Sequence, residues 1–400
     1  MRIALAYSGG LDTSVIIPWL KEHYGAEVFA VIVNVGQKDD FPRLRQKALD
    51  SGASDVWIPD CRAEFLESYA FPIVSAEARY EGQYLLGTAI ARPLIAAKLV
   101  EGAARFHADA VAHGATGKGN DQVRFEVAVR ALNPALNIIA PWRLWDLKGR
   151  QDEMLYAKEH GVPVDSTPAA PYSRDENLWH VSHEGGVIED PGMPIPPDVY
   201  TWTVHPEEAP DEAEWVKIGF HEGIPVQING ESLDPVSVVE WLNAAGGRHG
   251  VGRLTMVENR LVGIKSRGVY ETPAGTILYQ AHHALASLTW DREVAYYMGE
   301  VGAKLARLVY DGLWFSPLRS VLLAAIKAAN QPVTGTVSVK LYKGQASPEA
   351  VSDAPQSLYS PELATFEASS FSHQDAEGFI RLWGLSNQVY GTVLRQGARP

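Results

Sequence analysis

Short apolar runs alternate with helix-length stretches over the N-terminal part of the chain. The runs Ile3–Ala6 and Val28–Val35 are apolar almost throughout, which is typical of strands buried on both faces. Further strands are expected at Asp55–Ile58, Ala108–Ala112 and Asn137–Ala140, and helices at Thr13–Tyr24, Pro42–Ser51, Tyr84–Ala104 and Asp121–Leu132. This alternation predicts an α/β fold with a doubly wound parallel sheet.

The pattern changes at Val162–Tyr172, where Pro163, Pro168 and Pro171 interrupt it. The acidic, proline-rich stretch Asp190–Glu214 predicts a long surface loop. Beyond it we expect antiparallel strands within Trp215–Ile228, helices at Ser237–Ala245 and Ser287–Tyr310, an edge or two-sided strand at Thr334–Tyr342, and a last helix at Leu385–Arg395. The chain is therefore expected to contain a parallel α/β domain (1–165), an α+β domain (172–360) and a C-terminal helical arm (375–400).

The stretch Tyr7–Ser14 joins the first strand to the first helix. Gly9 and Gly10 allow a tight turn, and the unpaired N–H groups of a helix start favour a bound anion. The spacing matches neither G-x-x-x-x-G-K-[ST] nor G-x-G-x-x-G. An ordinary helix start capped by Asp12 or Thr13 is the alternative. The place of the loop at a strand end favours phosphate binding instead.

A second glycine-rich loop, within His113–Glu126, again follows a strand and opens a helix. Asn120 and Asp121 fall at the helix start, and Arg124 follows one turn later on the same face. Such a carboxylate and guanidinium suit the ammonium and carboxylate groups of an amino acid. A surface ion pair is the alternative, but the glycines and the strand-end position favour binding.

A third group of charged residues covers Gly250–Arg260 and Lys265–Pro273. Its charges are interleaved with glycine and β-branched residues over two short strands. From this pattern alone, a solvated hairpin is the preferred interpretation.

Composition limits the kinds of partner. The 400 residues include 48 acidic and 35 basic side chains, for a formal net charge of −13, which disfavours a nucleic-acid partner. The single cysteine, Cys61, excludes an internal disulfide and a cysteine metal cluster, and we expect it to be a buried small side chain. The chain has no apolar run of transmembrane length and no signal peptide, so we expect no membrane partner and a cytoplasmic location.

Several motifs carry a resemblance to a known family. Tyr7–Ser14 resembles the PP-loop, S-G-G-x-D-[ST], of enzymes that cleave ATP between its α- and β-phosphates. With it, the chain resembles the argininosuccinate synthase family up to about Asp291, and more weakly beyond, through Gly36–Lys38, Tyr84–Thr88, His113–Glu126, Asp175–Leu178, Val257–Arg260 and Tyr270–Leu278. The resemblance implies a ligase of arginine biosynthesis. It would join citrulline to aspartate through a citrullyl-adenylate, release AMP and pyrophosphate, and need no protein nucleophile.

The resemblance also implies which residues meet each substrate. ATP would contact Ala6, Tyr7, Ser8, Gly9, Gly10, Leu11, Asp12, Thr13, Ser14, Val33 and Gly114. Citrulline would contact Tyr84, Asn120, Arg124, Ser173, Ser182, Glu258 and Tyr270. Aspartate would contact Thr88, Thr116, Asn120 and Asp121.

Other implications concern metal and assembly. Mg²⁺ is expected beside pyrophosphate, with Asp12 and Asp121 as candidate carboxylates. The family implies a homotetramer whose C-terminal arm reaches a neighbouring copy.

In this chain Ala89 stands where many members carry serine, so Thr88 is the only hydroxyl nearby. As alternatives, Ser173 and Ser182 could be turn caps, and Tyr270 could simply pack in the core.

Three other functions compete with this one. A glutamine-fed PP-loop ligase often needs a glutaminase cysteine, and a tRNA-modifying PP-loop enzyme would favour basic charge and further cysteines. The lone Cys61 and the acidic balance disfavour both. A nucleotide sensor without turnover would explain Tyr7–Ser14 but not the Asn120, Asp121 and Arg124 group.

Overall fold

The computed structural model describes residues 1–163, 172–366 and 372–397. The chain forms two compact units, Met1–Ser357 and Leu358–Pro400. Most of the predicted boundary at Val162–Tyr172 lies outside the described residues, so a division of the first unit there stays a prediction. Within the described ranges, no helix is both long and apolar enough to cross a membrane.

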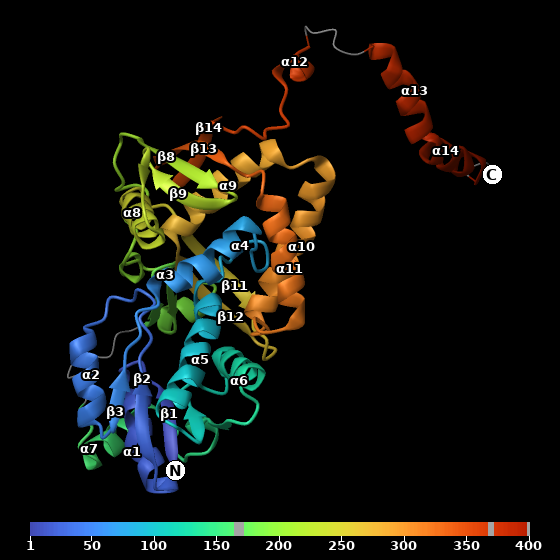
Figure 1. Ribbon diagram of the computed structural model, residues 1–400. Coiled ribbons are helices and arrows are strands. Elements are labelled where there is room, and N and C mark those ends of the chain that lie inside the picture. Colours follow the sequence, from blue (N-terminus) through green and yellow to red (C-terminus); the bar gives the residue numbers. More distant parts are fainter. Residues whose placement is uncertain (164–171, 367–371, 398–400) are drawn as a thin grey trace. The chain divides into compact units, whose positions relative to one another are not determined.

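A five-stranded parallel sheet forms the N-terminal part of the first unit (Figure 1). Its order is β3–β2–β1–β4–β5, and every neighbouring pair runs parallel. The strands are β1 (Arg2–Ala6), β2 (Glu27–Val31), β3 (Asp55–Trp57), β4 (Ala110–Ala112) and β5 (Asn137–Ile139). The predicted parallel sheet is confirmed, although β2 ends at Val31 rather than at Val35.

Helices cover both faces of this sheet, as the doubly wound prediction requires. On one face Leu5 packs in a core with Ile16, and on the other Ala4 and Val31 share a core with Leu94. The helices are α1 (Leu11–Tyr24), α2 (Phe41–Asp50), α5 (Gly87–Arg105), α6 (Asp121–Leu132) and α7 (Arg150–Glu159).

Tyr84 lies before α5, so the prediction of a helix over Tyr84–Ala104 is wrong at its start. The amide of Tyr80 donates to the carbonyl of Tyr84 at 2.9 Å, which closes a turn ahead of the helix. Leu86 follows with a φ of 63°, a left-handed conformation that interrupts a right-handed helix. The turn leaves the Tyr84 hydroxyl to accept the amide of Thr88 at 3.1 Å.

The segment between β3 and α5 folds into short helices that the sequence pattern did not predict. They are α3 (Arg62–Phe65), a π-helix (Leu66–Ala70) and α4 (Phe71–Ser75). Cys61 precedes α3 and is 2% exposed, which confirms the expectation of a buried small side chain. Burial raises the pKa of its thiol to about 11.

Two antiparallel sheets complete the first unit. One has the order β11–β12–β7–β6 and consists of β6 (Ser173–Glu176), β7 (Val181–Glu184), β11 (Arg253–Asn259) and β12 (Lys265–Glu271). The other has the order β10–β9–β8–β13–β14 and consists of β8 (Glu214–His221), β9 (Ile224–Ile228), β10 (Glu231–Ser232), β13 (Gly335–Tyr342) and β14 (Gln345–Ser352). The antiparallel strands expected within Trp215–Ile228 are therefore confirmed. β13 lies between β8 and β14, so the edge-strand option for Thr334–Tyr342 is wrong.

The helices that accompany these sheets correct a second prediction. They are α8 (Pro235–Arg248), α9 (Pro273–Thr289), α10 (Arg292–Tyr310) and α11 (Pro317–Asn330). The single helix expected at Ser287–Tyr310 is two helices, because Trp290 is extended and the Asp291 side chain accepts the amide of Val294 at 2.8 Å. This carboxylate cap begins α10.

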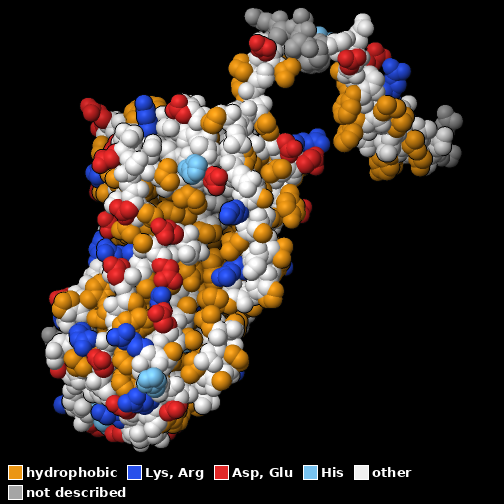
Figure 2. Space-filling view, viewed as in Figure 1, with side chains coloured by type: hydrophobic (Ala, Val, Ile, Leu, Met, Phe, Trp, Pro, Cys, Tyr) orange, Lys and Arg blue, Asp and Glu red, His pale blue; other side chains and the backbone are white. Residues whose placement is uncertain are grey.

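The second unit is helical and consists of α12 (Pro361–Ala364), α13 (His373–Trp383) and α14 (Leu385–Gly397). The last helix was predicted at Leu385–Arg395, which α14 confirms. Large apolar side chains along α13 and α14 are exposed, and Figure 2 shows them gathered over these helices. They include Phe379, Ile380, Leu382, Trp383, Leu385, Val389, Tyr390, Val393 and Leu394.

Candidate active site

The loop between β1 and α1 forms one wall of a cavity of about 850 Å³ in the first unit. Gly10 occupies the N-cap position in an extended conformation, and no side chain among the described residues caps the helix. The alternative of a helix start capped by Asp12 or Thr13 is therefore wrong. Leu11, Asp12 and Thr13 line the cavity, so the amides that a helix start leaves unpaired lie at its wall.

Gly9 and Ser14 belong to this loop but do not line the cavity. A Cβ on Gly9 would collide with the Leu44 side chain, and the φ of Gly9 is +77°. Ser14 is fully buried, where its hydroxyl donates to the Gly10 carbonyl at 2.9 Å and lies 2.9 Å from the Tyr7 hydroxyl. Gly9 and Ser14 are thus the two predicted site residues that the structure does not bring to the cavity.

The loop after β4 adjoins this first loop. Gly114 lies so close to Thr13 that a Cβ on it would be 3.1 Å from Thr13 Cγ2. Gly114 and Thr116 line the cavity together with Val33, which follows β2. β1, β2 and β4 are neighbours in the parallel sheet, so their carboxyl ends open onto the same cavity.

The start of α6 brings charged side chains to the cavity. Asp121 lies 3.0 Å from Arg124 Nη1, and Arg124 Nε donates to the Tyr310 carbonyl at 3.0 Å. Both residues line the cavity, so the i,i+3 ion pair exists but is not a surface pair. Burial opposes ionisation of Asp121, yet the charges and hydrogen bonds of Arg92 and Arg124 lower its pKa.

Asn120 ties α6 to the hairpin formed by β11 and β12. Its Oδ1 accepts the amide of Leu261, which lies between these strands, at 2.9 Å. Its side chain does not cap α6. Asn120 lines the cavity as well, so it holds the hairpin tip beside the start of α6.

The inner face of this hairpin is buried, so the prediction of a solvated hairpin holds only for its outer face. Glu258 accepts hydrogen bonds from the Tyr270 hydroxyl at 3.0 Å and from the Tyr310 hydroxyl at 2.6 Å. Tyr84 packs on Tyr270 with ring centroids 4.7 Å apart. Burial, then the Glu258 charge, raise the pKa of Tyr270 well above its ordinary value, so this hydroxyl remains a donor. Tyr270 is packed in the core and also lines the cavity.

Three hydroxyl side chains that were predicted to contact substrates lie on α5, β6 and β7 and complete this side of the cavity. Thr88 Oγ1 lies 2.9 Å from His180 Nε2 and 3.5 Å from Ser182 Oγ. Thr88, Ser173 and Ser182 all line the cavity. Burial, then the charges of Arg92 and His183, lower the pKa of His180 to about 3, so this ring stays neutral at physiological pH.

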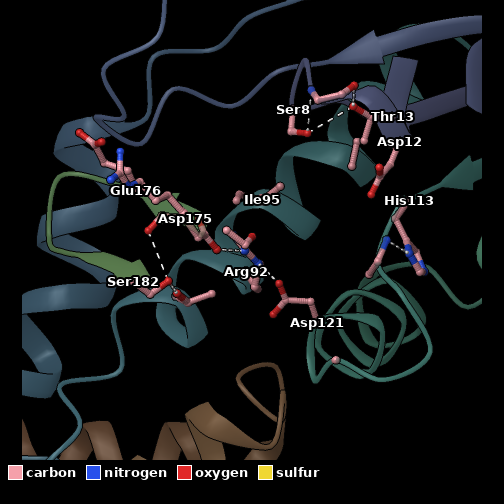
Figure 3. Close-up of a pocket in the computed structure, with 18 of the residues that line it drawn as sticks. Ser8, Asp12, Thr13, Arg92, Ile95, His113, Asp121, Asp175, Glu176 and Ser182 are labelled. Carbon is pink, nitrogen blue, oxygen red and sulfur yellow. Dashed lines mark hydrogen bonds and ion pairs between the residues drawn. The ribbon is translucent and has the colours of Figure 1, made fainter. Parts of the chain in front are cut away.

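Charged residues missed by the sequence reasoning also line the cavity. Arg92 bonds to Asp121 and Asp175, and Figure 3 shows its side chain between these two carboxylates. Arg260 pairs with Glu184 at 2.6 Å. A usable signal for Arg92 was its place four residues after Thr88, on the same face of the predicted helix. The further missed cavity residues include Lys38, Arg150 and Arg174.

The described residues contain no group of three or more histidine, cysteine, aspartate or glutamate side chains that could hold a metal ion. Mg²⁺ bound through phosphate oxygens needs only one or two carboxylates. Asp12 fits such a role, because the fully buried Glu153 contacts it and Glu153 Oε1 has no hydrogen-bond partner in the described part of the chain. Asp121 fits it less well, because two guanidinium groups already hold it.

Comparisons with known proteins show which family the chain belongs to. The family model for the arginosuccinate synthase N-terminal HUP domain matches residues 2–163, and the model for the arginosuccinate synthase C-terminal domain matches residues 172–390. An argininosuccinate synthase from Desulfitobacterium hafniense is 57% identical over 97% of this chain and 97% of its own length. Those from Carboxydothermus hydrogenoformans and Pelotomaculum thermopropionicum are each 56% identical over the same shares of both chains. The resemblance seen in the motifs is confirmed, and the chain belongs to the argininosuccinate synthase family.

Proposed function

We propose that this chain condenses L-citrulline with L-aspartate through a citrullyl-adenylate formed in the cavity. Its family makes it a ligase that uses ATP as a substrate. The observation that carries the proposal is the meeting of three parts in one cavity. These are the uncapped start of α1, the charged start of α6 and the buried Glu258 with its tyrosines.

The chemistry consists of two displacements. The ureido oxygen of citrulline attacks the α-phosphorus of ATP, and pyrophosphate leaves as the bond between the α- and β-phosphates breaks. The aspartate amine then attacks the activated ureido carbon and loses a proton, and AMP leaves with the former ureido oxygen. No protein nucleophile takes part, so the protein contributes positioning and charge stabilisation.

The substrates are assigned to the parts of the cavity that suit their charges. ATP phosphates belong at the start of α1, with Val33 and Gly114 beside the adenosine. Citrulline belongs near Tyr84, Asn120, Arg124, Ser173, Ser182, Glu258 and Tyr270. Aspartate belongs near Thr88, Thr116, Asn120 and Asp121. The fit of polar side chains to each group supports this assignment.

Mg²⁺ is proposed as the partner of the leaving pyrophosphate. When bound, it would supply positive charge to phosphate oxygens. Asp12 is the carboxylate we propose to face it, because Asp12 lines the cavity at the start of α1.

We also propose a cytoplasmic location, where ATP is available as a substrate.

A homotetramer is proposed for the assembly, with the C-terminal arm (375–400) reaching a neighbouring copy. Exposed apolar side chains along α13 and α14 support this, because a contiguous apolar surface of this kind marks an interaction site. Docking of the arm on its own chain is the competing arrangement.

The first prediction concerns the products. Continuous turnover of ATP to AMP and pyrophosphate should occur only when citrulline and aspartate are both present, because AMP leaves only when aspartate attacks the adenylate. Chromatography of the nucleotides gives the result, with mixtures lacking one amino acid as controls. Stoichiometric ADP would contradict the proposal.

The second prediction follows the oxygen. Citrulline labelled with ¹⁸O at the ureido group should transfer its label to AMP, since that oxygen attacks the α-phosphorus. Mass spectrometry of AMP and pyrophosphate measures the transfer, with labelled water as the control. Label found in pyrophosphate or water, with none in AMP, rules out the adenylate route.

A third prediction tests the charged start of α6. Arg124→Ala should weaken citrulline binding by ~2–5 kcal/mol, the usual cost of breaking a buried charge pair. Asp121→Asn should instead raise the KM for aspartate or lower its turnover. Arg130→Ala is the matched control, because Arg130 is exposed on the same helix. Unchanged kinetics for both amino acids in both variants would show the assignment to be wrong.

The fourth prediction concerns the arm. Removal of the residues from Gly384 onward should shift the protein to smaller species in light scattering, because α14 carries much of the exposed apolar surface. ATP binding should largely survive, since the cavity lies in the first unit. Gln388→Glu serves as a control on the same helix. A truncated protein that stays tetrameric contradicts the proposal, and one that unfolds favours docking on its own chain.

A further inference from the structure

Arg92 bridges two carboxylates across the cavity, and no role has so far been assigned to it. It lies on α5, and its side chain is 14% exposed. Its Nε donates to Asp121 Oδ2 at 2.7 Å, and its Nη2 donates to Asp175 Oδ2. The guanidinium therefore joins the start of α6 to β6, as Figure 3 shows.

The two oxygens of Asp121 are held by different cations. Arg92 binds Oδ2, and Arg124 Nη1 donates to Oδ1 at 3.0 Å. A carboxylate held at both oxygens cannot rotate freely, yet it keeps lone pairs for further donors. It can therefore receive an amino group in one fixed direction.

The other end of the bridge reaches the β6–β7 hairpin. Asp175 belongs to β6, and its carbonyl accepts the Ser182 hydroxyl at 3.5 Å. Among the described residues, Arg92 is the one cation in ion-pair contact with Asp175. Burial raises the pKa of Asp175, and the Arg92 charge opposes that rise. Arg92 thus stabilises the ionised form of a carboxylate that burial disfavours.

We propose that Arg92 is a positioning residue for the second displacement. It fixes the carboxylate of Asp121 against the incoming aspartate amine, and it holds α5 and α6 in place against the β6–β7 hairpin. This inference rests on the proposed function. Arg92 is already matched by two carboxylates, so the geometry favours positioning over direct capture of a substrate carboxylate.

The two half-reactions allow a direct test. Exchange of labelled pyrophosphate into ATP needs citrulline but not aspartate, so it reports adenylate formation alone. We expect Arg92→Gln to keep this exchange within about threefold of the native protein and to raise the KM for aspartate about tenfold or more. Arg92→Lys keeps the charge and should recover part of the loss. If Arg92→Gln lost pyrophosphate exchange to the same extent as it lost the aspartate step, the inference would be overturned.

A second variant separates positioning from simple stability. Arg92→Gln leaves the partly buried Asp175, whose side chain is 33% exposed, without its cation, which should lower the Tm. Adding Asp175→Asn removes that charge, so the Tm of the double variant should recover while the KM for aspartate stays high. If both recover together, Arg92 is only structural and the inference fails. Arg248→Gln is the control, because it loses a pair with Glu214 outside the cavity.

Failure of the inference is distinguishable from failure of the proposed function. A native protein that makes no AMP from the three substrates would disprove the proposed function. A native protein that does make AMP, with an Arg92→Gln variant of unchanged KM for aspartate, would disprove only the role of Arg92. Direct capture of the citrulline carboxylate by Arg92 predicts instead that Arg92→Lys and Arg92→Gln lose exchange as well.

Discussion

The site depends on one geometric constraint, the common direction of β1, β2 and β4. Parallel neighbours end at the same edge of a sheet, so the segments that follow them must converge. Convergence brings Gly114 so close to Thr13 that a Cβ at this position would force a neighbour to shift by a few tenths of an ångström. It also places two helix starts, those of α1 and α6, on one cavity. A shift in the order of these strands would separate the two loops and dismantle the site.

The side of the cavity that α5, β6 and β7 line depends on how closely α5 approaches the β6–β7 hairpin. A Cβ on Gly87 would collide with the His180 ring, and Asn177 Nδ2 donates to the Gly87 carbonyl at 3.0 Å. Burial, then the charge of Arg92, keep the pKa of His180 low, so the ring at this contact is neutral. The glycine before Thr88 therefore has a packing role in addition to any part in binding.

Much of this arrangement could be predicted from local patterns, because strand and helix periodicity and glycine turns are local properties. The parallel sheet and the two glycine-rich loops follow from them. Ser173, Ser182 and Glu258 line the cavity as well, but they were expected there only through the family resemblance. The bridge from Asp121 through Arg92 to Asp175 could not, because it joins residues from separate segments of the chain. The buried inner face of the β11–β12 hairpin could not be predicted for the same reason, because Glu258 accepts hydrogen bonds from hydroxyls on β12 and α10. Substrate roles for the lining residues stay predictions.

The lone cysteine has a practical consequence. Cys61 lies at the start of α3, is 2% exposed, and is the only thiol in the 400 residues. The thiolate is the nucleophile that attacks a thiol reagent, and a pKa of about 11 keeps the thiolate scarce at neutral pH. Labelling of the native chain must therefore wait for an opening of this part of the core. The rate of that labelling reports how often this part of the core opens, and it needs no engineered cysteine.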